Sequence, residues 1–415
     1  MVKRVCFRPR AAFVFVNKSQ MKRIALIIGL LLLGTGVFSQ TLNGTLVRTS
    51  TADPCLIFDN GYFYLTMTGS SRIAMVSDKR LSMLGTDEHP TMDNIVYNSA
   101  YDPSVEELFG PGATINGTWS PEMHYFSEEE FPGESGWYMY FSLRQKMEDS
   151  RNIRMVVLKS ASGRVDGPFV SPVTGTTGQT QPFLNPDGSV LVDWCLGPSL
   201  LRIPTGKYKG VYLTWVEETG RGEGLGKFYQ IIKISKISKP WKLEGESAII
   251  TVPTQEWEFH GSSQTYPRVV EGATAVYGDH GEIFMAYCGS GFWSDYGLGQ
   301  LTLLRDGDDY ADPMKTESWI KYEGNPVFSS ARSSELRGAG HGFFLTDAKG
   351  QRFFCYHAYP VVNGRKSKTR NAYIEPYFID YGAACPSAPY GVLIMGAMGN
   401  GKCAPVDTPI RFSRK

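Results

Sequence analysis

The stretch Arg268-Val-Val-Glu271-Gly-Ala-Thr-Ala-Val-Tyr277 decides the fold, together with the second apolar run Glu282-Ile-Phe-Met-Ala-Tyr-Cys288 that follows it. The turn Asp279-His280-Gly281 lies between them, and two apolar runs joined by a Gly-containing turn are typical of a β-hairpin. Glu271 therefore stands at the start of a strand. One interpretation is a solvated carboxylate at a strand edge, because charged side chains are mostly exposed. The other is a side chain that projects into a cavity shared with other segments.

Repetition of this layout favours the shared cavity. Four other segments have a polar or small residue, then Pro or Gly, an apolar strand, a turn or loop and a second strand; they contain Asp53-Pro54, Trp119-Ser-Pro121, Gly197-Pro198 and Gly340-His341. With the Glu271 segment, five starts recur about every 70 residues. Such a period is typical of propeller blades, each a four-stranded sheet that radiates from a central channel. The sequence therefore predicts an all-β fold, a five-bladed β-propeller.

Composition agrees with this architecture. Aromatic residues make up 13% of the chain, which also has 45 Gly and 24 Pro, and this suits many short strands joined by turns. The 42 basic residues balance the 41 acidic ones, so the chain lacks the charge excess that nucleic acid or an anionic membrane would attract. We therefore expect a neutral partner, no nucleic acid, and a monomer.

A signal peptide is predicted near the N-terminus. Its basic start, apolar core and small residues before the cleavage point are found in Lys22-Arg23, Ile24–Leu33 and Val37-Phe-Ser39. The apolar core is too short to span a membrane, so we expect cleavage before Gln40 and no membrane insertion of the mature chain. The predicted location is the periplasm or the outside of the cell.

The chain is divided accordingly into four parts. A complete signal behind Met21 indicates that translation begins there, and that an upstream extension precedes it. The extension, the signal peptide, the propeller and a short C-terminal tail are predicted at residues 1–20, 21–39, 40–382 and 383–415.

Six cysteines follow the signal peptide, in an oxidising setting that permits disulfides. Four of them lie inside apolar strands, where a buried free thiol is the expected state; they are Cys55, Cys195, Cys288 and Cys355. Cys385 and Cys403 lie in the Gly- and Pro-rich tail and are predicted to pair. No Cys-x-x-Cys or His-x-x-x-His spacing indicates a zinc site.

Five motifs resemble those of glycoside hydrolase family 43. They are Ala52-Asp53-Pro54, Trp119-Ser-Pro-Glu-Met-His124, Val270-Glu271-Gly272, Cys288-Gly-Ser-Gly-Phe-Trp293-Ser-Asp-Tyr296 and Gly338-Ala-Gly-His341-Gly342. The resemblance runs from about Thr51 to Asp380. A segment like Thr254-Gln-Glu-Trp-Glu258, with a long loop like Asp306 to Asn325, is similar to the branches that contain exo-acting arabinofuranosidases. The resemblance implies a five-bladed propeller that hydrolyses furanosides or xylosides with inversion.

The resemblance also implies that Asp53 is the general base and Glu271 the general acid. An inverting glycosidase needs a protonated carboxyl for the leaving oxygen and an ionised carboxylate that activates water, about 6.5 to 9.5 Å apart. Strands that begin on the first and fourth blades face each other across a funnel and can provide this gap. Glu271 then needs a raised pKa, from burial or a neighbouring negative charge, while Asp53 must stay ionised.

The third carboxylate departs from the family pattern. The resemblance implies an Asp at the start of the third blade that adjusts the pKa of the acid, but Leu196 or Gly197 occupies this place. Asp193 lies a few residues upstream and is the candidate substitute, against the alternative of a solvated residue. A second alignment puts Gln181-Pro182 there, which also lacks a charge. Without a third acid, the pKa of Glu271 would depend on desolvation alone.

Other candidates are expected to line the sugar pocket; they are Trp119, Glu122, Phe292, Trp293, His341 and Arg370. The alternatives are packing between blades for Trp119, a surface position for Arg370 and a satisfied polar residue for His341. The resemblance gives His341 an axial place, where some relatives hold calcium or sodium through water; a lone His is weak evidence for metal. We therefore expect no required cofactor, and we interpret His124 and His357 as structural.

Two classes of function follow. The first is an exported exo-acting glycosidase, an α-L-arabinofuranosidase acting on arabinose-containing plant polysaccharides or oligosaccharides, with β-galactofuranosidase and β-xylosidase as near variants. The second is a propeller that binds sugars without hydrolysing them, because the third-blade Asp is missing. A retaining fructosidase is disfavoured, since the sequence has no Asn-Asp-Pro-Asn or Arg-Asp-Pro motif.

Overall fold

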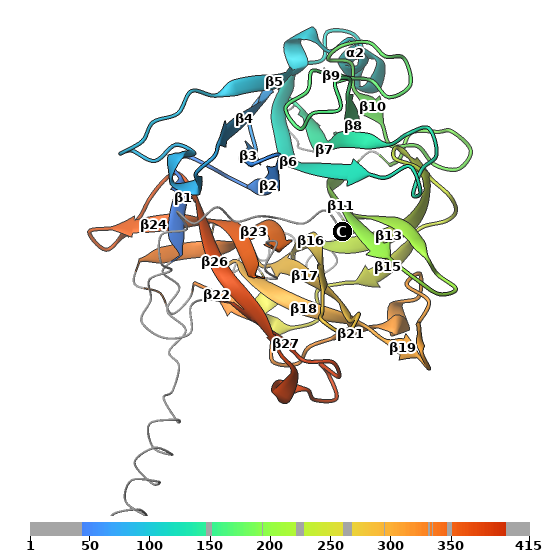
Figure 1. The fold of residues 1–415 in the computed structure, drawn as a ribbon, viewed down its shortest axis with the longest axis vertical. Coiled ribbons are helices and arrows are strands. Elements are labelled where there is room, and N and C mark those ends of the chain that lie inside the picture. The colour runs from blue at the N-terminus through green and yellow to red at the C-terminus, as the bar shows by residue number, and fades with distance from the viewer. Residues whose placement is uncertain are drawn as a thin grey trace, which may run out of the picture. The chain divides into compact units, whose positions relative to one another are not determined.

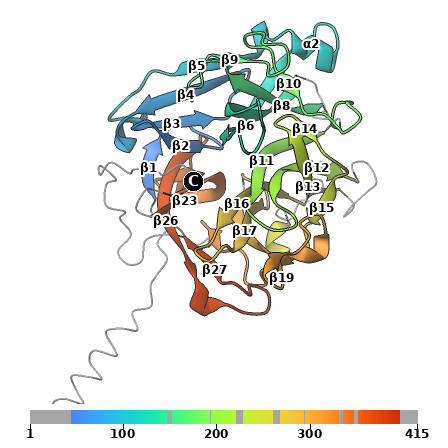
Figure 2. The same ribbon diagram turned by 45° about the vertical axis from the view of Figure 1, so that its right-hand side comes forward.

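The computed structural model describes residues 44–146, 152–192, 194–220, 228–259, 268–293, 295–330, 333, 335–346 and 351–395. Within them, antiparallel sheets follow one another around a common centre, from the blue sheet of β2–β5 to the orange-red sheet that contains β23 (Figures 1 and 2). Helix is confined there to α2 (Ser104–Phe109) and short 3-10 turns. The predicted all-β, five-bladed β-propeller is confirmed.

Each blade is built from strands that are consecutive in the chain. Blade I contains β2 (Cys55–Asp59), β3 (Tyr62–Met67), β4 (Arg72–Asp78) and β5 (Asn94–Asn98). Blade II contains β6 (Ile115–Phe126), β7 (Gly136–Gln145), β8 (Ile153–Ser160), β9 (Phe169–Val170) and β10 (Gln181–Pro182). Blade III contains β11 (Cys195–Ile203), β12 (Gly210–Thr219), β13 (Tyr229–Lys239), β14 (Lys242–Leu243) and β15 (Ala248–Thr251).

The last two blades carry additional edge strands. Blade IV contains β16 (Val270–Tyr277), β17 (Ile283–Gly289), β18 (Gly297–Leu303), β21 (Trp319–Lys321) and β22 (Phe328–Ser329), and the hairpin β19 (Arg305–Asp306) and β20 (Asp309–Tyr310) follows β18. Blade V contains β23 (Leu336–Thr346), β24 (Arg352–Val362), β25 (Arg365–Lys366), β26 (Asn371–Asp380), β27 (Val392–Met395) and β1 (Thr45–Arg48).

The strand β1 closes the ring. It pairs with β26, with Thr45 opposite Ile374 and Leu46 opposite Tyr373, and Figure 1 shows blue β1 beside red β26. Blade V therefore takes strands from both ends of the described chain. Residues 392–395 of the predicted tail belong to this blade as β27, which pairs with the other end of β26.

Apolar runs form strands here because each blade packs against a neighbour on both faces. All seven residues of β17 are buried. Phe284 and Cys288 belong to the core shared with blade V, whereas Met285 and Tyr287 belong to the core shared with blade III. Successive side chains of a strand point to opposite faces, so one run serves both cores. Each buried side chain contributes about 1.5–3 kcal/mol, which holds neighbouring blades together.

A residue with positive φ recurs at the inner end of every blade. We call these five positions the bulge ring: Asp53 (φ 49°), Ser120 (50°), Gly197 (63°), Gly272 (58°) and His341 (39°). Four of them interrupt the pairing of β6, β11, β16 and β23, and Asp53 immediately precedes Pro54 and β2. A bulge redirects side chains relative to a regular strand. The five positions are therefore structurally equivalent, although their residues differ.

Hydrogen bonds of the bulge ring join four of the five blades to the preceding blade of the ring. The backbone N–H of Ser120 donates to Thr68 Oγ1 (2.8 Å), that of Gly197 to Ser142 Oγ (3.1 Å) and that of His341 to Cys288 Sγ (3.0 Å). The backbone N of Asp53 lies 3.1 Å from His357 Nδ1, which closes the circle from blade V to blade I. At each of these four contacts, a side chain on the second strand of one blade, or directly after it in the case of Thr68, positions the bulge-ring residue of the next blade.

The predictions for the cysteines and the N-terminus have different outcomes. Cys55, Cys288 and Cys355 are buried free thiols, as predicted, and Cys195 is also buried, with its thiol 3.5 Å from the carbonyl oxygen of Val192. Cys403 lies outside the described residues, so its disulfide with Cys385 stays a prediction. The predicted signal peptide also lies outside them. No helix that the structure describes is long and apolar enough to cross a membrane.

A buried carboxylate, Glu375 on β26, packs beside the closing strand. It is 1% exposed; its Oε1 accepts a hydrogen bond of 2.5 Å from Tyr356 Oη, and its Oε2 has no hydrogen-bond partner among the described residues. Burial raises the pKa of Glu375 to about 7. Because this pKa exceeds that of the unfolded chain, the folded state binds the extra proton, and this stabilisation is lost as pH rises through 7.

We expect the free energy of unfolding to fall by about 3 kcal/mol between pH 5 and pH 8 through Glu375. Glu375→Gln should remove this fall, and should raise the melting temperature at pH 8 while leaving it nearly unchanged at pH 5. Thermal unfolding at the two pH values measures both effects. Glu88→Gln, at an exposed position, is the matched control. An unchanged fall in the Glu375→Gln variant would contradict the prediction.

Candidate active site

Asp53 lies in the bulge ring of blade I, where blade V builds most of its surroundings. Its side chain is 11% exposed, and Oδ1 lies 3.0 Å from His357 Nδ1, 3.1 Å from Arg370 Nη1 and 3.9 Å from His341 Nδ1. Its Oδ2 accepts a hydrogen bond of 2.5 Å from Thr68 Oγ1. The carboxylate is therefore held in one orientation by both of its oxygens.

The charges around Asp53 keep it ionised. Burial alone would raise the pKa of Asp53, but the guanidinium of Arg370 and the imidazoles of His341 and His357 together hold it well below its usual range. Burial and the charge of Arg370 lower the pKa of His357 to about 3, so this imidazole is neutral near pH 7. Asp53 is thus an ionised carboxylate whose formal positive partner in blade V is Arg370.

Glu271 on β16 has the opposite electrostatic environment. Its Oε1 accepts a hydrogen bond of 2.8 Å from Tyr296 Oη. Burial raises the pKa of Glu271; His341 and the hydrogen bond from Tyr296 lower it by less, and the negative charge of Asp53 adds a smaller increase, followed by a small opposite effect of Arg370. The pKa values of the two carboxyl groups are therefore moved in opposite directions. Environments that move two pKa values apart are what acid and base roles require.

His341 lies beside Asp53 and beside Gly272, the residue that follows Glu271. A Cβ atom built on Gly272, the residue after Glu271, would come within 2.9 Å of His341 Nδ1. Glycine at this position is thus required by the approach of the imidazole as well as by its φ of 58°. The rings of His341 and His357 stack at 6.2 Å, and those of His357 and Tyr296 at 5.7 Å. The stacked rings therefore connect Tyr296, which donates a hydrogen bond to Glu271, with His357, which contacts Asp53.

Blade III presents a glycine at its bulge-ring position. A Cβ atom built on Gly197 would meet no atom within 4 Å, whereas Leu196 packs into the core between blades. Of the two alternatives for the family's third carboxylate, Gly197 is therefore the structural equivalent of Asp53. Gln181 lies on β10, an outer strand of blade II, away from the bulge ring. Asp193 lies outside the described residues, so its role stays a prediction.

Phe292 and Trp293 lie next to Arg370. The Arg370 guanidinium carbon lies 4.7 Å from the centroid of the Phe292 ring. The Phe292 and Trp293 rings meet edge to face at 4.7 Å, and Trp293 is 38% exposed. These contacts bring three of the residues predicted for the sugar pocket together, beside Asp53.

The other two predicted residues, Trp119 and Glu122, belong to blade II. Glu122 is 8% exposed, and its Oε2 lies 2.9 Å from His124 Nε2. Burial lowers the pKa of His124, which favours the neutral imidazole beside Glu122. No hydrogen bond or ion pair of the described residues joins Glu122 to Asp53 or Glu271. Trp119 is half-buried against the core of blades III and IV, with the Arg144 guanidinium 5.5 Å from its ring.

Sequence reasoning assigned no part in the site to His357, Tyr296 or Thr68. His357 was interpreted as structural because it lies in an apolar run, yet its ring contacts Asp53. The position of His357 inside the apolar strand β24 indicates that its imidazole has a polar partner, since a buried polar side chain needs one. Tyr296 is the last residue of the motif Cys288–Tyr296, and Thr68 directly follows β3. Sequence spacing alone does not indicate that Tyr296 contacts Glu271 or that Thr68 contacts Asp53.

The described residues offer no metal site. They contain no group of three or more His, Cys, Asp or Glu side chains that could hold a metal ion. The imidazole of His341 is oriented toward Asp53 and Gly272. These residues do not fit a directly coordinated ion.

Comparisons with known proteins agree on one family. The sequence profile of Glycosyl hydrolases family 43 matches residues 42–381. The chain is 25% identical over 309 residues to an extracellular exo-alpha-(1->5)-L-arabinofuranosidase of Streptomyces avermitilis, which covers 74% of this chain and 54% of that protein. It is also 25% identical over 396 residues to alpha-L-arabinofuranosidase B of Pyricularia oryzae, which covers 89% of this chain and 70% of that one. The chain thus spans about half the length of the Streptomyces relative.

Solved structures show the same fold. An alpha-L-arabinofuranosidase from Lactobacillus brevis superimposes with a TM-score of 0.60 at 19% identity, over 89% of this chain and 98% of that one. An exo-1,5-alpha-L-arabinanase from a bovine ruminal metagenomic library has a TM-score of 0.52 at 14% identity, over 86% and 100%.

Proposed function

Because the chain belongs to glycosyl hydrolase family 43, we propose that it is an exported, exo-acting, inverting α-L-arabinofuranosidase. Its substrates are arabinose-containing plant polysaccharides or oligosaccharides, with β-galactofuranosides and β-xylosides as near variants. One observation carries the proposal: Asp53 and the Glu271-Gly272 segment both lie beside His341, and the pKa values of Asp53 and Glu271 are moved in opposite directions.

In this proposal Glu271 is the general acid and Asp53 the general base. Burial raises the pKa of Glu271, which favours its protonated form, and in this role Glu271 donates the proton to the leaving glycosidic oxygen. Asp53, ionised beside Arg370, accepts a proton from the water that attacks the anomeric carbon from the opposite face. Attack opposite to the leaving group gives inversion. Arg370 and Phe292 are placed to contact the sugar that lies over Asp53.

The choice of sugar and the location rest on the relatives. The two similar proteins named above are arabinofuranosidases, and the Streptomyces protein is described as extracellular. The predicted signal peptide before Gln40 supports the same location for this chain.

Aryl glycosides test the proposal. The chain from Gln40 onward should hydrolyse 4-nitrophenyl α-L-arabinofuranoside faster than the β-D-galactofuranoside or the β-D-xyloside. Proton NMR of an arabino-oligosaccharide digest should show the inverted anomer first.

Gly197 favours a second candidate, a propeller that binds sugars without hydrolysing them, because this blade presents no carboxylate at its bulge. Calorimetric binding of arabino-oligosaccharides without hydrolysis of any of the three aryl glycosides would replace the first proposal with this one.

A further inference from the structure

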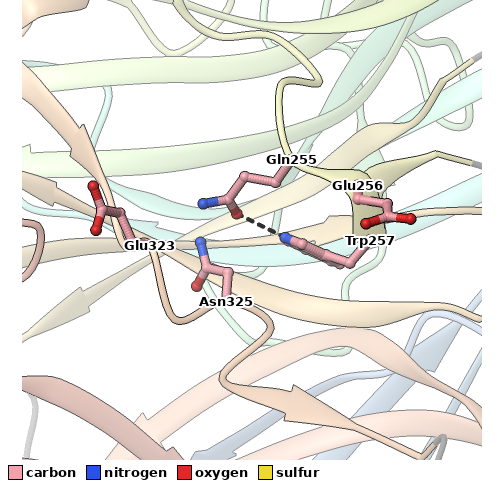
Figure 3. Close-up of a pocket in the computed structure, with 5 residues that line it drawn as sticks. All are labelled: Gln255, Glu256, Trp257, Glu323 and Asn325. Carbon is pink, nitrogen blue, oxygen red and sulfur yellow. Dashed lines mark hydrogen bonds between the residues drawn. The ribbon is translucent and has the colours of Figure 1, made fainter.

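A hollow lies on blade IV, and the residues that line it differ from those that surround Asp53 and Glu271. Its volume is about 510 Å³, and the lining residues, shown in Figure 3, are Gln255, Glu256, Trp257, Glu323 and Asn325. The first three precede β16, and the last two connect β21 with β22. We propose that this hollow binds a neutral sugar unit of a polysaccharide, a role that rests on the proposed function for its biological substrate.

Trp257 provides a flat apolar wall. A Cβ atom built on Gly289 or Gly299 would come within 2.5 or 2.7 Å of its ring carbons, so the indole packs directly on the backbone of β17 and β18. Its Nε1 donates a hydrogen bond of 2.7 Å to Gln255 Oε1, as Figure 3 shows. Glycines on one side and a fixed hydrogen bond at the edge orient the ring, which borders the hollow. Pockets for neutral ligands typically combine an aromatic wall with a few placed polar groups.

The polar groups of the hollow divide into fixed and available ones. The amides are engaged: Gln255 Nε2 donates to the Tyr322 carbonyl oxygen (2.8 Å), and Asn325 Oδ1 accepts from the Gln300 backbone N–H (2.8 Å). Glu256 and Glu323 are exposed, and no hydrogen bond or ion pair of the described residues involves their carboxylates. Ionised carboxylates are acceptors only, which suits the hydroxyl groups of a sugar.

The two carboxylates also determine the class of sugar. Negative charges on Glu256 and Glu323 repel the carboxylate of a uronic acid but leave a neutral pentose or hexose unaffected. The ligand class is therefore a neutral glycan such as arabinan or xylan, and acidic glycans such as polygalacturonate are disfavoured.

A buried ion pair holds the wall of the hollow in place. Lys321 Nζ lies 2.6 Å from Glu258 Oε1, and Glu258 is fully buried. The other oxygen of Glu258 accepts from the backbone N–H groups of Thr254 (2.6 Å) and Gln255 (2.7 Å). The segment that carries Trp257 is thus attached to β21 before any ligand arrives, which lowers the entropy lost on binding.

The hollow and Glu271 lie on opposite faces of blade IV. Trp257 covers Gly289, which pairs with Val270 beside Glu271. Glu271 and its partner Cys288 are on the face toward blade V, whereas Trp257 and Tyr287 are on the face toward blade III. Since strands are about 4.8 Å apart, β18 lies about 10 Å from β16. A polysaccharide has further sugar units with which to occupy the hollow, whereas an aryl monoglycoside bound at the catalytic pair has none.

The experiment compares polymer and aryl glycoside. Glu256→Ala/Glu323→Ala, which removes both free carboxylates, and Trp257→Leu should each weaken binding of debranched arabinan in affinity electrophoresis about fivefold to tenfold. KM on arabinan should rise by the same factor, while kcat and the kinetics on 4-nitrophenyl α-L-arabinofuranoside stay unchanged. Wild type should not bind polygalacturonate. Glu88→Ala/Glu107→Ala, with the same charge change at exposed positions elsewhere, should bind as wild type does.

The outcomes separate this inference from the proposed function. Failure of the wild type on every aryl glycoside would overturn the proposed function, and arabinan binding would still report on the hollow. The inference is overturned if Glu256→Ala/Glu323→Ala binds arabinan as tightly as wild type. This double variant carries the test even if Trp257→Leu unfolds blade IV, which its melting temperature would reveal.

Discussion

Glu271→Gln is expected to lower kcat on an arabino-oligosaccharide about 10³-fold. A glutamine has the shape of the glutamic acid but has no proton to give to the leaving oxygen. On 2,4-dinitrophenyl arabinofuranoside, whose leaving group needs little protonation, the loss should be far smaller. Asp53→Asn should lose activity on both substrates, because activation of water is needed whatever the leaving group. Steady-state kinetics of both variants on the two substrates measure this contrast.

A matched control variant and two possible contrary results test the assignment of Asp53 and Glu271 as base and acid. Glu375→Gln is the same substitution at another buried carboxyl of the propeller, and it should keep the kcat of the wild type. Near-normal hydrolysis of the oligosaccharide by Asp53→Asn or Glu271→Gln would show that the residue is not catalytic. A first-formed sugar with retained configuration would exclude inversion.

Gly197→Asp is expected to extend activity to higher pH. The backbone tolerates the change, since Asp53 adopts φ 49° at the equivalent position and Gly197 has φ 63° with open space at its Cβ. A negative charge several ångströms from Glu271, at an effective dielectric near 20, contributes about 2 kcal/mol, which is somewhat more than one pKa unit. A higher pKa keeps Glu271 protonated to higher pH. The alkaline limb of the kcat/KM profile should therefore move up by about one pH unit.

Gly197→Asn is the control, because it has the same shape without the charge and should leave the limb in place. If Asp193 already supplies a nearby charge, Asp193→Asn should move the limb to lower pH. An unchanged profile for Asp193→Asn, together with a shift for Gly197→Asp, would show that burial and Asp53 alone raise the pKa of Glu271. Identical profiles for Gly197→Asp and Gly197→Asn would contradict the placement of Gly197 beside the acid.

The sequence by itself determined the fold class and the number of blades. Each blade needs its own apolar strands and turns, so five similar segments at regular spacing predict five sheets without knowledge of their contacts. The same spacing puts Asp53, Gly197, Glu271 and His341 at the inner ends of blades. Their meeting around one centre follows from the symmetry of a propeller, and so the lack of a carboxylate at the bulge of the third blade could also be read from the sequence.

Only the tertiary structure decided which side chains surround the two carboxyl groups. His357 and Arg370 reach Asp53 across 304 and 317 residues of chain, because β1 closes blade V and sets blade I beside it. In strands buried on both faces, apolar residues point to both sides of the sheet, so no alternation reveals which way His357 or Glu375 points. The Trp257 hollow likewise depends on glycines of two separate strands. Such contacts are set by packing between blades, which has no period in the sequence.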